Sequence, residues 1–174
     1  GEILGLDLGA RSAQDAIDVT RLMVGGTIQA TRLARKSMKV AVHLGGGLHH
    51  ATPEAGMGFC IFNDVAVAIA RLRARGFREP ILVVDLDMHD GNGTRSIFAH
   101  DSSVHTYSIH NEHWGATETV ASTSIALGAG VDDATFLGVL FGACRICTVV
   151  LRRAAAAGLL CSPVQRTLGP THCL

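Results

Sequence analysis

Three features that would indicate particular partners or compartments are missing from this sequence: an excess of one charge, a long uncharged apolar run and paired cysteines. Its 15 lysines and arginines balance 15 acidic residues, which gives no argument for a nucleic-acid partner. The apolar stretch 138–160 is interrupted by three arginines, so we expect no membrane span. The five cysteines lack disulfide-framework or zinc-ribbon spacing. That lack favours a reducing compartment and predicts a cytoplasmic protein, or a nuclear one in a eukaryote.

The pattern that is present predicts one α/β domain with an open parallel sheet. The 174 residues are 48% hydrophobic, which is enough for a single core. Short β-branched runs alternate with segments of helical periodicity, as in parallel sheets covered by helices. The expected strands cover 40–44, 81–86 and 104–109, and 111–131 is expected to be a long loop. The expected helices cover 13–37, a segment from Asn63 or Asp64 to Gly76, 93–99, and a segment from Asp132 or Asp133 to about 157.

Residues 81–94 carry the strongest chemical signal. After a buried strand, Asp85, Asp87 and His89 alternate with apolar residues, so an extended backbone would point all three the same way. Asp87 and His89 can form half of a zinc site, at the strand end where open α/β sheets bind ligands. For an isolated Asp-x-His pair, turn or capping residues are the alternative. The in-phase polar residues and the following Gly91-Asn92-Gly93 turn favour a site.

A second stretch, after the expected strand 40–44, strengthens that interpretation. Three glycines precede His49 and His50, but no G-x-G-x-x-G pattern is present, so a dinucleotide-binding loop is a poor explanation. We expect the glycines to bring the two histidines to the same pocket as Asp87. One histidine would accept a proton from metal-bound water, and Asp85 and Asn92 are available to fix its tautomer.

These motifs together resemble the zinc-dependent histone deacetylase family, which includes bacterial acetoin-utilisation and acetylpolyamine deacetylases. The resemblance lies in Leu44–Ala51, Gly58–Cys60, Asn63-Asp64 and Asp85–Gly93 and covers about residues 15–137. It implies an arginase–deacetylase fold with three αβα layers. Asn92, where many members have a second Asp, resembles the class IV and related bacterial branch.

By this resemblance, the site residues receive specific roles. Asp87 and His89 match two zinc ligands, and His49 and His50 match the tandem catalytic histidines. Asp85 and Asn92 match the groups behind those histidines. Two further sets follow: Gly58 and Phe59 match the wall of the acyl-lysine tunnel, and Asp85, Asp87, His89, Ser108 and Ile109 match a structural potassium site.

The sequence also departs from the family. The third zinc ligand is expected from a later Asp and the oxyanion donor from a later Tyr, yet no acidic residue follows Asp133 and the one tyrosine, Tyr107, lies in an expected strand. Asp90 replaces the His or Gln usual after the ligand histidine. We therefore assign 1–140 to a partial histone-deacetylase-like domain and 141–174 to an atypical tail. A shifted reading frame, a misjoined segment or real divergence would explain that tail.

The resemblance implies a zinc-dependent amidohydrolase that removes acetyl or other acyl groups from lysine or a small amine. Because half of the expected site is not found, we expect the chain as written to turn over little substrate. Only about three strands of the expected sheet can be read, so apolar surface would stay uncovered and we also expect poor solubility. The alternative is a non-enzymatic remnant that binds a metal or a partner. A nucleotide-binding α/β domain is not supported by the glycine pattern.

Overall fold

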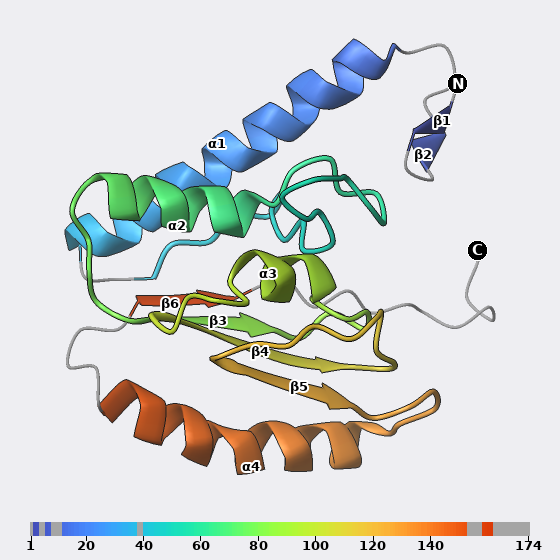
Figure 1. Cartoon of the computed structure of the whole chain (residues 1–174), viewed down its shortest axis with the longest axis vertical. Helices are drawn as coiled ribbons and strands as arrows, with labels where there is room; N and C mark the ends of the chain where they lie inside the picture. The colour runs from blue at the N-terminus through green and yellow to red at the C-terminus, as the bar shows by residue number, and fades with distance from the viewer. Residues whose placement is uncertain (1, 4–5, 8–11, 38–39, 153–157, 162–174) are drawn as a thin grey trace.

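The structure, a computed structural model, describes residues 2–3, 6–7, 12–37, 40–152 and 158–161. Its centre is a parallel sheet of strand order β5-β4-β3-β6 with helices on both faces (Figure 1). The strands of this sheet are β3 Ile81–Asp85, β4 Val104–His110, β5 Ser122–Ala126 and β6 Gly158–Cys161. The helices are α1 Ala13–Ser37, α2 Asp64–Ala74, α3 Asn92–Ile97 and α4 Asp133–Arg152, and an antiparallel pair, β1 Glu2–Ile3 and β2 Leu6–Asp7, precedes α1. The predicted α/β class and open parallel sheet are confirmed.

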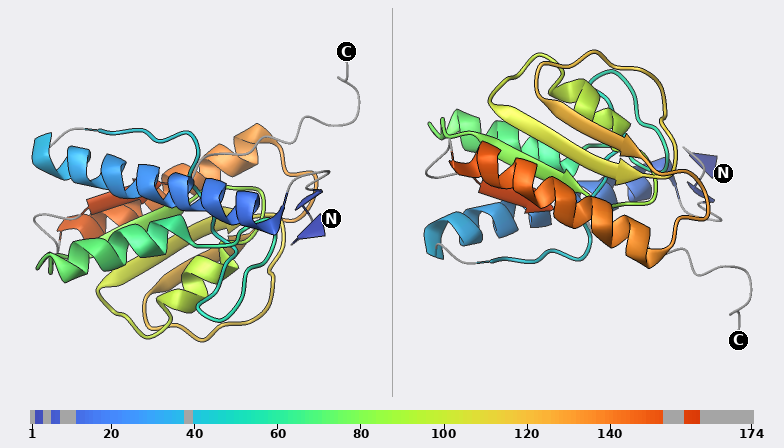
Figure 2. Two further views of the ribbon diagram at one scale, coloured as in Figure 1. Left: turned by 90° about the horizontal axis from the view of Figure 1, so that it is seen from above. Right: turned by 90° about the horizontal axis from the view of Figure 1, so that it is seen from below.

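Alternation along β3 divides the core between the two faces of the sheet. Ile81 and Val83 pack toward α2 and α3, whereas Leu82 points to the opposite face and packs with β4 residues and the first turns of α4. Figure 2 shows α1 and α2 across one face and α4 across the other. Each face of a parallel sheet needs such a cover, because its strands are apolar on both sides. The predicted three-layer αβα arrangement is therefore confirmed.

The strand predicted at 40–44 is wrong. Within the described residues this segment pairs with no strand, and Val40, Val42 and Leu44 are exposed. A strand exists only through hydrogen bonds to a neighbour. Both edges of β3 are already hydrogen-bonded to parallel strands. Ile81 lies opposite Val104 of β4 on one edge and opposite Gly158 of β6 on the other. The apolar run therefore has the composition of a buried strand but does not join the sheet.

The loop predicted at 111–131 is also partly wrong, because it contains β5. This strand joins the sheet at the outer edge of β4, with Thr106 opposite Ser122 and His110 opposite Ala126. Its sequence, Ser-Thr-Ser-Ile-Ala, carries one large apolar residue, which is too weak a periodic signal to separate an edge strand from a polar loop. The last helix was predicted to reach about 157; α4 ends at Arg152, and 153–157 lie outside the described residues.

Side chains cap the starts of α1 and α2. Ser12 and Asp15 form a reciprocal box before α1, in which the Asp15 N–H donates to the Ser12 hydroxyl and the Ser12 N–H donates to the Asp15 carboxylate. The Asn63 side chain accepts from the Ala66 N–H at the start of α2. The buried side of α1 was not foreseen: it consists of Thr20, Thr27 and Thr31, while much of its apolar stripe faces outward.

Asp64 ties the loop that carries the histidines to the helical layer. Its carboxylate is completely buried and accepts hydrogen bonds from the Thr27 hydroxyl of α1 at 2.5 Å, the Gly47 N–H at 3.1 Å and the Leu48 N–H at 2.7 Å. One side chain at the first residue of α2 therefore satisfies donors from α1 and from the glycine-rich segment. This arrangement fixes the position from which His49 and His50 start.

We expect Asp64→Ala to lower the free energy of unfolding by about 3 kcal/mol or more, because three buried donors would lose their acceptor. Urea denaturation followed by circular dichroism measures it. The matched control is Asp18→Ala, which removes an exposed ion pair to Arg21 and should cost less than about 1 kcal/mol. Equal losses for the two variants would contradict the anchoring role of Asp64.

Candidate active site

The acidic and imidazole side chains after β3 are arranged by two consecutive side-chain-to-backbone turns. Asp85 lies on the same face as Ile81 and Val83 and accepts a hydrogen bond from the Asp87 N–H at 3.1 Å. Asp87 in turn accepts one from the His89 N–H at 2.8 Å. The His89 Nδ1 lies 3.1 Å from the Asp87 Oδ1. The backbone is thereby folded so that the Asp87 carboxylate and the His89 ring converge, as their spacing predicted.

The first turn of α3 holds the backbone of the histidine pair. The Thr94 N–H donates to the His49 carbonyl at 3.0 Å, and the Thr94 hydroxyl accepts from the Asn63 side-chain amide at 2.9 Å. A Cβ at Gly93 would collide with the backbone carbonyls of His50 and Ala51. The second glycine of the Gly-Asn-Gly turn is therefore required for close approach, since any side chain would push α3 away from the histidines.

The two histidines have different partners behind their rings. His49 Nδ1 lies 2.6 Å from Asp85 Oδ2, and His50 Nδ1 lies 2.8 Å from Asn92 Oδ1. Both contacts were predicted from the sequence and are present. On the other side, His49 Nε2 lies 3.8 Å from Asp87 Oδ1, and the two imidazole rings are 4.1 Å apart. Asp87, His89 and both histidines therefore lie together on one side of the sheet, as predicted.

Burial and partners shift the two imidazoles in opposite directions. Burial acts to lower the pKa of His49, but the hydrogen bond and charge of Asp85, helped by Asp87 and Asp90, outweigh it and raise this pKa above its ordinary value. For His50, burial also lowers the pKa, and the neutral Asn92 offsets only part of that effect. His49 thus favours holding a proton, and His50 favours the neutral form.

Gly58 and Trp114 both lie against the His50 ring. Gly58 has a φ of +52°, and a Cβ there would meet the His50 ring, so a side chain is excluded on two grounds. Phe59 follows with a φ of +65° and is mostly exposed. The Trp114 indole stacks on His50 with ring centroids 4.3 Å apart and an interplanar angle of 6°. The stacking places Trp114 directly on one of the two candidate catalytic histidines.

A profile of one protein family, described as the histone deacetylase domain, matches residues 10–139. The chain belongs to the histone deacetylase family. This confirms the resemblance found in the sequence motifs, and the match includes every residue named in the pocket above.

Individual members of the histone deacetylase family and its relatives are similar over the same region. An uncharacterised protein from Picosynechococcus is 38% identical over 134 residues, which is 76% of this chain and 44% of that protein. A probable deacetylase from Methanothermobacter thermautotrophicus is 41% identical over 109 residues, 62% of this chain and 32% of that protein. The crystal structure of an HDAC homologue complexed with SAHA aligns with a TM-score of 0.65 at 30% identity, covering 74% of this chain and 38% of that one. The chain thus spans less than half the length of the relatives that it matches.

Two of the side chains at this site fit the zinc ion that the deacetylase family implies. Asp87 offers a carboxylate oxygen and His89 an imidazole nitrogen 3.1 Å apart, a separation that two ligands of one ion can have. Within the described residues, no third His, Cys, Asp or Glu lies close enough to join both. The two predicted ligands therefore fit, and the third ligand, for which sequence analysis found no candidate, is not supplied by the described part of the chain. Tyr107 is buried on the α4 face, away from the pocket.

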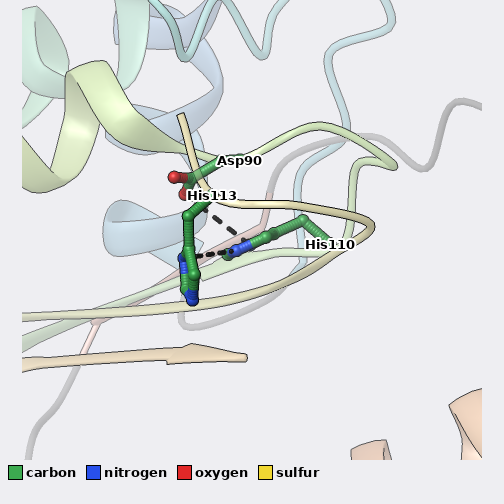
Figure 3. A group of neighbouring side chains, drawn as sticks. All are labelled: Asp90, His110 and His113. Carbon is green, nitrogen blue, oxygen red and sulfur yellow. Dashed lines mark hydrogen bonds and ion pairs between the residues drawn. The ribbon is translucent and has the colours of Figure 1, made fainter. Parts of the chain in front are cut away.

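A second group, Asp90, His110 and His113, also brings three metal-ligating side chains together (Figure 3). His110 Nε2 lies 3.1 Å from His113 Nδ1, and His110 Nδ1 lies 2.8 Å from the Ser108 hydroxyl. Both carboxylate oxygens of Asp90, however, accept hydrogen bonds from the Arg95 guanidinium at 2.5 and 2.7 Å. A dication would be repelled by that guanidinium, so hydrogen bonding explains this group better than a metal does.

Ser108 and Asp85 are register partners on β4 and β3. The potassium site predicted from Asp85, Asp87, His89, Ser108 and Ile109 stays a prediction.

In the described part of the chain, no helix has the length and apolar character needed to cross a membrane.

In the metal-free chain, we expect His49 to lose its ring proton above pH 6.5 and His50 below it, because Asp85 stabilises the His49 cation and burial destabilises that of His50. Titration of the histidine ring signals by NMR measures both. Asn92→Asp is the matched control, since a carboxylate of the same shape should raise the His50 pKa. A His50 that titrates above His49 in the unchanged chain would overturn this assignment.

Proposed function

We propose that this chain carries the acid–base half of a zinc-dependent amidohydrolase site that removes acetyl or other acyl groups from lysine or a small amine. The observation that carries the proposal is the placement of His49 and His50 beside Asp87 and His89, with a carboxylate behind one histidine and an amide behind the other. Membership of the histone deacetylase family supports the reaction class.

Asp87 and His89 are proposed to hold the zinc ion. When bound, the zinc would supply a Lewis acid that polarises the acyl carbonyl and acidifies a water molecule. The two turns orient both donors before any ion arrives, because the Asp87 N–H donates to the Asp85 carboxylate and the His89 N–H donates to the Asp87 carboxylate. Such preorganised ligands lose little freedom on binding.

We assign proton acceptance to His50. Its Nδ1–H donates to Asn92 Oδ1, so that Nε2 carries the lone pair, and a neutral amide behind the ring leaves the imidazole neutral. His49 Nδ1–H donates to the buried Asp85 carboxylate, which stabilises the positive ring. His49 is therefore suited to carry the charge that appears during the reaction, and a proton held on the pair can pass to the leaving amine.

The remaining predicted site residues receive supporting roles. We propose that Gly58, Phe59 and Trp114 form the wall along which the acylated amine lies. Gly58 approaches His50 closely, and the next residue, Phe59, is mostly exposed. A potassium ion at Asp85, Asp87, His89, Ser108 and Ile109 would brace the end of β3. Residues 1–140 are proposed as the deacetylase-like part and 141–174 as a tail of different character.

Zinc binding tests the ligands directly. We expect one zinc ion per chain, measured by metal analysis after dialysis, and weaker binding in Asp87→Asn and His89→Ala, measured by chelator competition. Changing groups that only support a ligand typically weakens binding about 10–100-fold, so loss of a ligand should cost at least as much. His100→Ala removes an exposed histidine and should leave the affinity unchanged. If neither Asp87→Asn nor His89→Ala weakens zinc binding, the proposed ligands are wrong.

Turnover of an acetyl-lysine reporter tests the acid–base assignment. His50→Ala should leave zinc affinity nearly unchanged and lower zinc-dependent hydrolysis by about 10²–10⁴-fold, because His50 acts on the proton rather than on the metal. Unchanged hydrolysis would remove His50 from the mechanism. Zinc bound through Asp87 and His89 with no hydrolysis by the unchanged chain would favour the alternative, a metal-binding module without turnover.

A further inference from the structure

Asp90 and Arg95 form a buried ion pair that the proposed reaction does not use. Asp90 is completely buried and Arg95 is 5% exposed. The guanidinium donates to both carboxylate oxygens, with Nη1 2.5 Å from Oδ1 and Nη2 2.7 Å from Oδ2. This two-bond geometry is the most directional that a charged pair can adopt. Asp90 is also the position at which the sequence departs from its family, and Arg95 provides a partner for that change.

The pair reaches beyond itself to the segment that follows β4. The Trp114 N–H donates to Asp90 Oδ2 at 2.9 Å, and Arg95 Nη2 lies 3.5 Å from the Gly115 carbonyl. Arg95 Nη1 also donates to the Ser124 hydroxyl of β5 at 3.0 Å. The backbone is therefore held on both sides of the Trp114 side chain, by the anion on one side and by the cation on the other.

The side chain held in this way lies on the candidate catalytic pair. The Trp114 indole is stacked on His50 and meets His89 edge-on, with centroids 5.4 Å apart. Because a buried ion pair is costly to break, its two partners stay together and the loop around residue 114 has little freedom.

We propose that the Asp90–Arg95 pair positions Trp114 flat against His50, and that Asp90 and Arg95 are therefore positioning residues for the reaction proposed above. The indole covers one face of the imidazole and limits how that ring can turn, while Asn92 fixes its Nδ1. The consequence for turnover rests on the proposed function. The positioning itself does not, and it can be measured without zinc or substrate.

The ring current of the indole provides that measurement. Trp114 is the only tryptophan of the chain, and stacking shifts the His50 ring protons upfield in NMR spectra. His50→Ala identifies the His50 signals, and Trp114→Leu gives their position without an indole. We expect Asp90→Leu/Arg95→Met, which removes the pair without leaving a lone buried charge, to move the His50 signals most of the way to the Trp114→Leu position. Glu112→Gln, which removes one negative charge from the same loop, should not move them.

Each outcome has a defined meaning. His50 signals that stay upfield in the double variant would overturn the proposal. If circular dichroism shows that the double variant is unfolded, Arg95→Lys replaces it. Lysine keeps the charge but not the two-bond geometry, so a partial downfield shift supports the positioning role and no shift overturns it. If the unchanged chain hydrolyses the reporter measurably, the same variants should lower kcat by up to about 10²-fold. That is the effect of displacing a catalytic group by about 1 Å. Absence of zinc-dependent hydrolysis in the unchanged chain would count against the proposed function alone.

Discussion

The hydrogen bond between Asp85 and His49 is the interaction on which the rest of the site depends. It joins the end of a buried strand to the loop that carries both histidines, at 2.6 Å and with both side chains almost fully buried. The same carboxylate accepts the Asp87 N–H and so begins the turn that directs Asp87 and His89. A buried carboxylate is stable only when its oxygens are satisfied. The strand end, the metal-ligating turn and the histidine loop therefore form together or not at all.

The two histidines have different groups behind their rings, and this difference suits them to different proton-transfer roles. His49 faces a carboxylate, whereas His50 faces the amide of Asn92 and an indole ring. Groups whose surroundings push their pKa values apart are suited to opposite proton-transfer roles. The structure adds one level that the motif does not contain: the ion pair of Asp90 and Arg95 sets the loop that places Trp114 on His50. The environment of one histidine thus extends from β3 across α3 to the loop after β4.

Sequence predicted the parts of this site that local chemistry determines. The alternation of Asp85, Asp87 and His89 fixed which side chains converge, and the order of motifs indicated which group lies behind each histidine. Strand pairing could not be read in the same way. The segment 40–44 has the composition of a strand, but both edges of β3 are occupied by β4 and β6. The strand β5 pairs with β4 although its sequence has little strand composition. The role of Asp90 was equally hidden, because a charge five residues away in sequence gives no sign of burial or of contact with residue 114.

We propose that Asp87 and His89 bind zinc within reach of the two histidines. An anomalous diffraction map at the zinc absorption edge, from crystals of the zinc-loaded chain, would locate the ion. We expect one strong peak in contact with the Asp87 carboxylate and His89 Nδ1, on the side of the sheet that carries His49 and His50. A peak at His110 and His113 instead, or one that touches neither Asp87 nor His89, would contradict it.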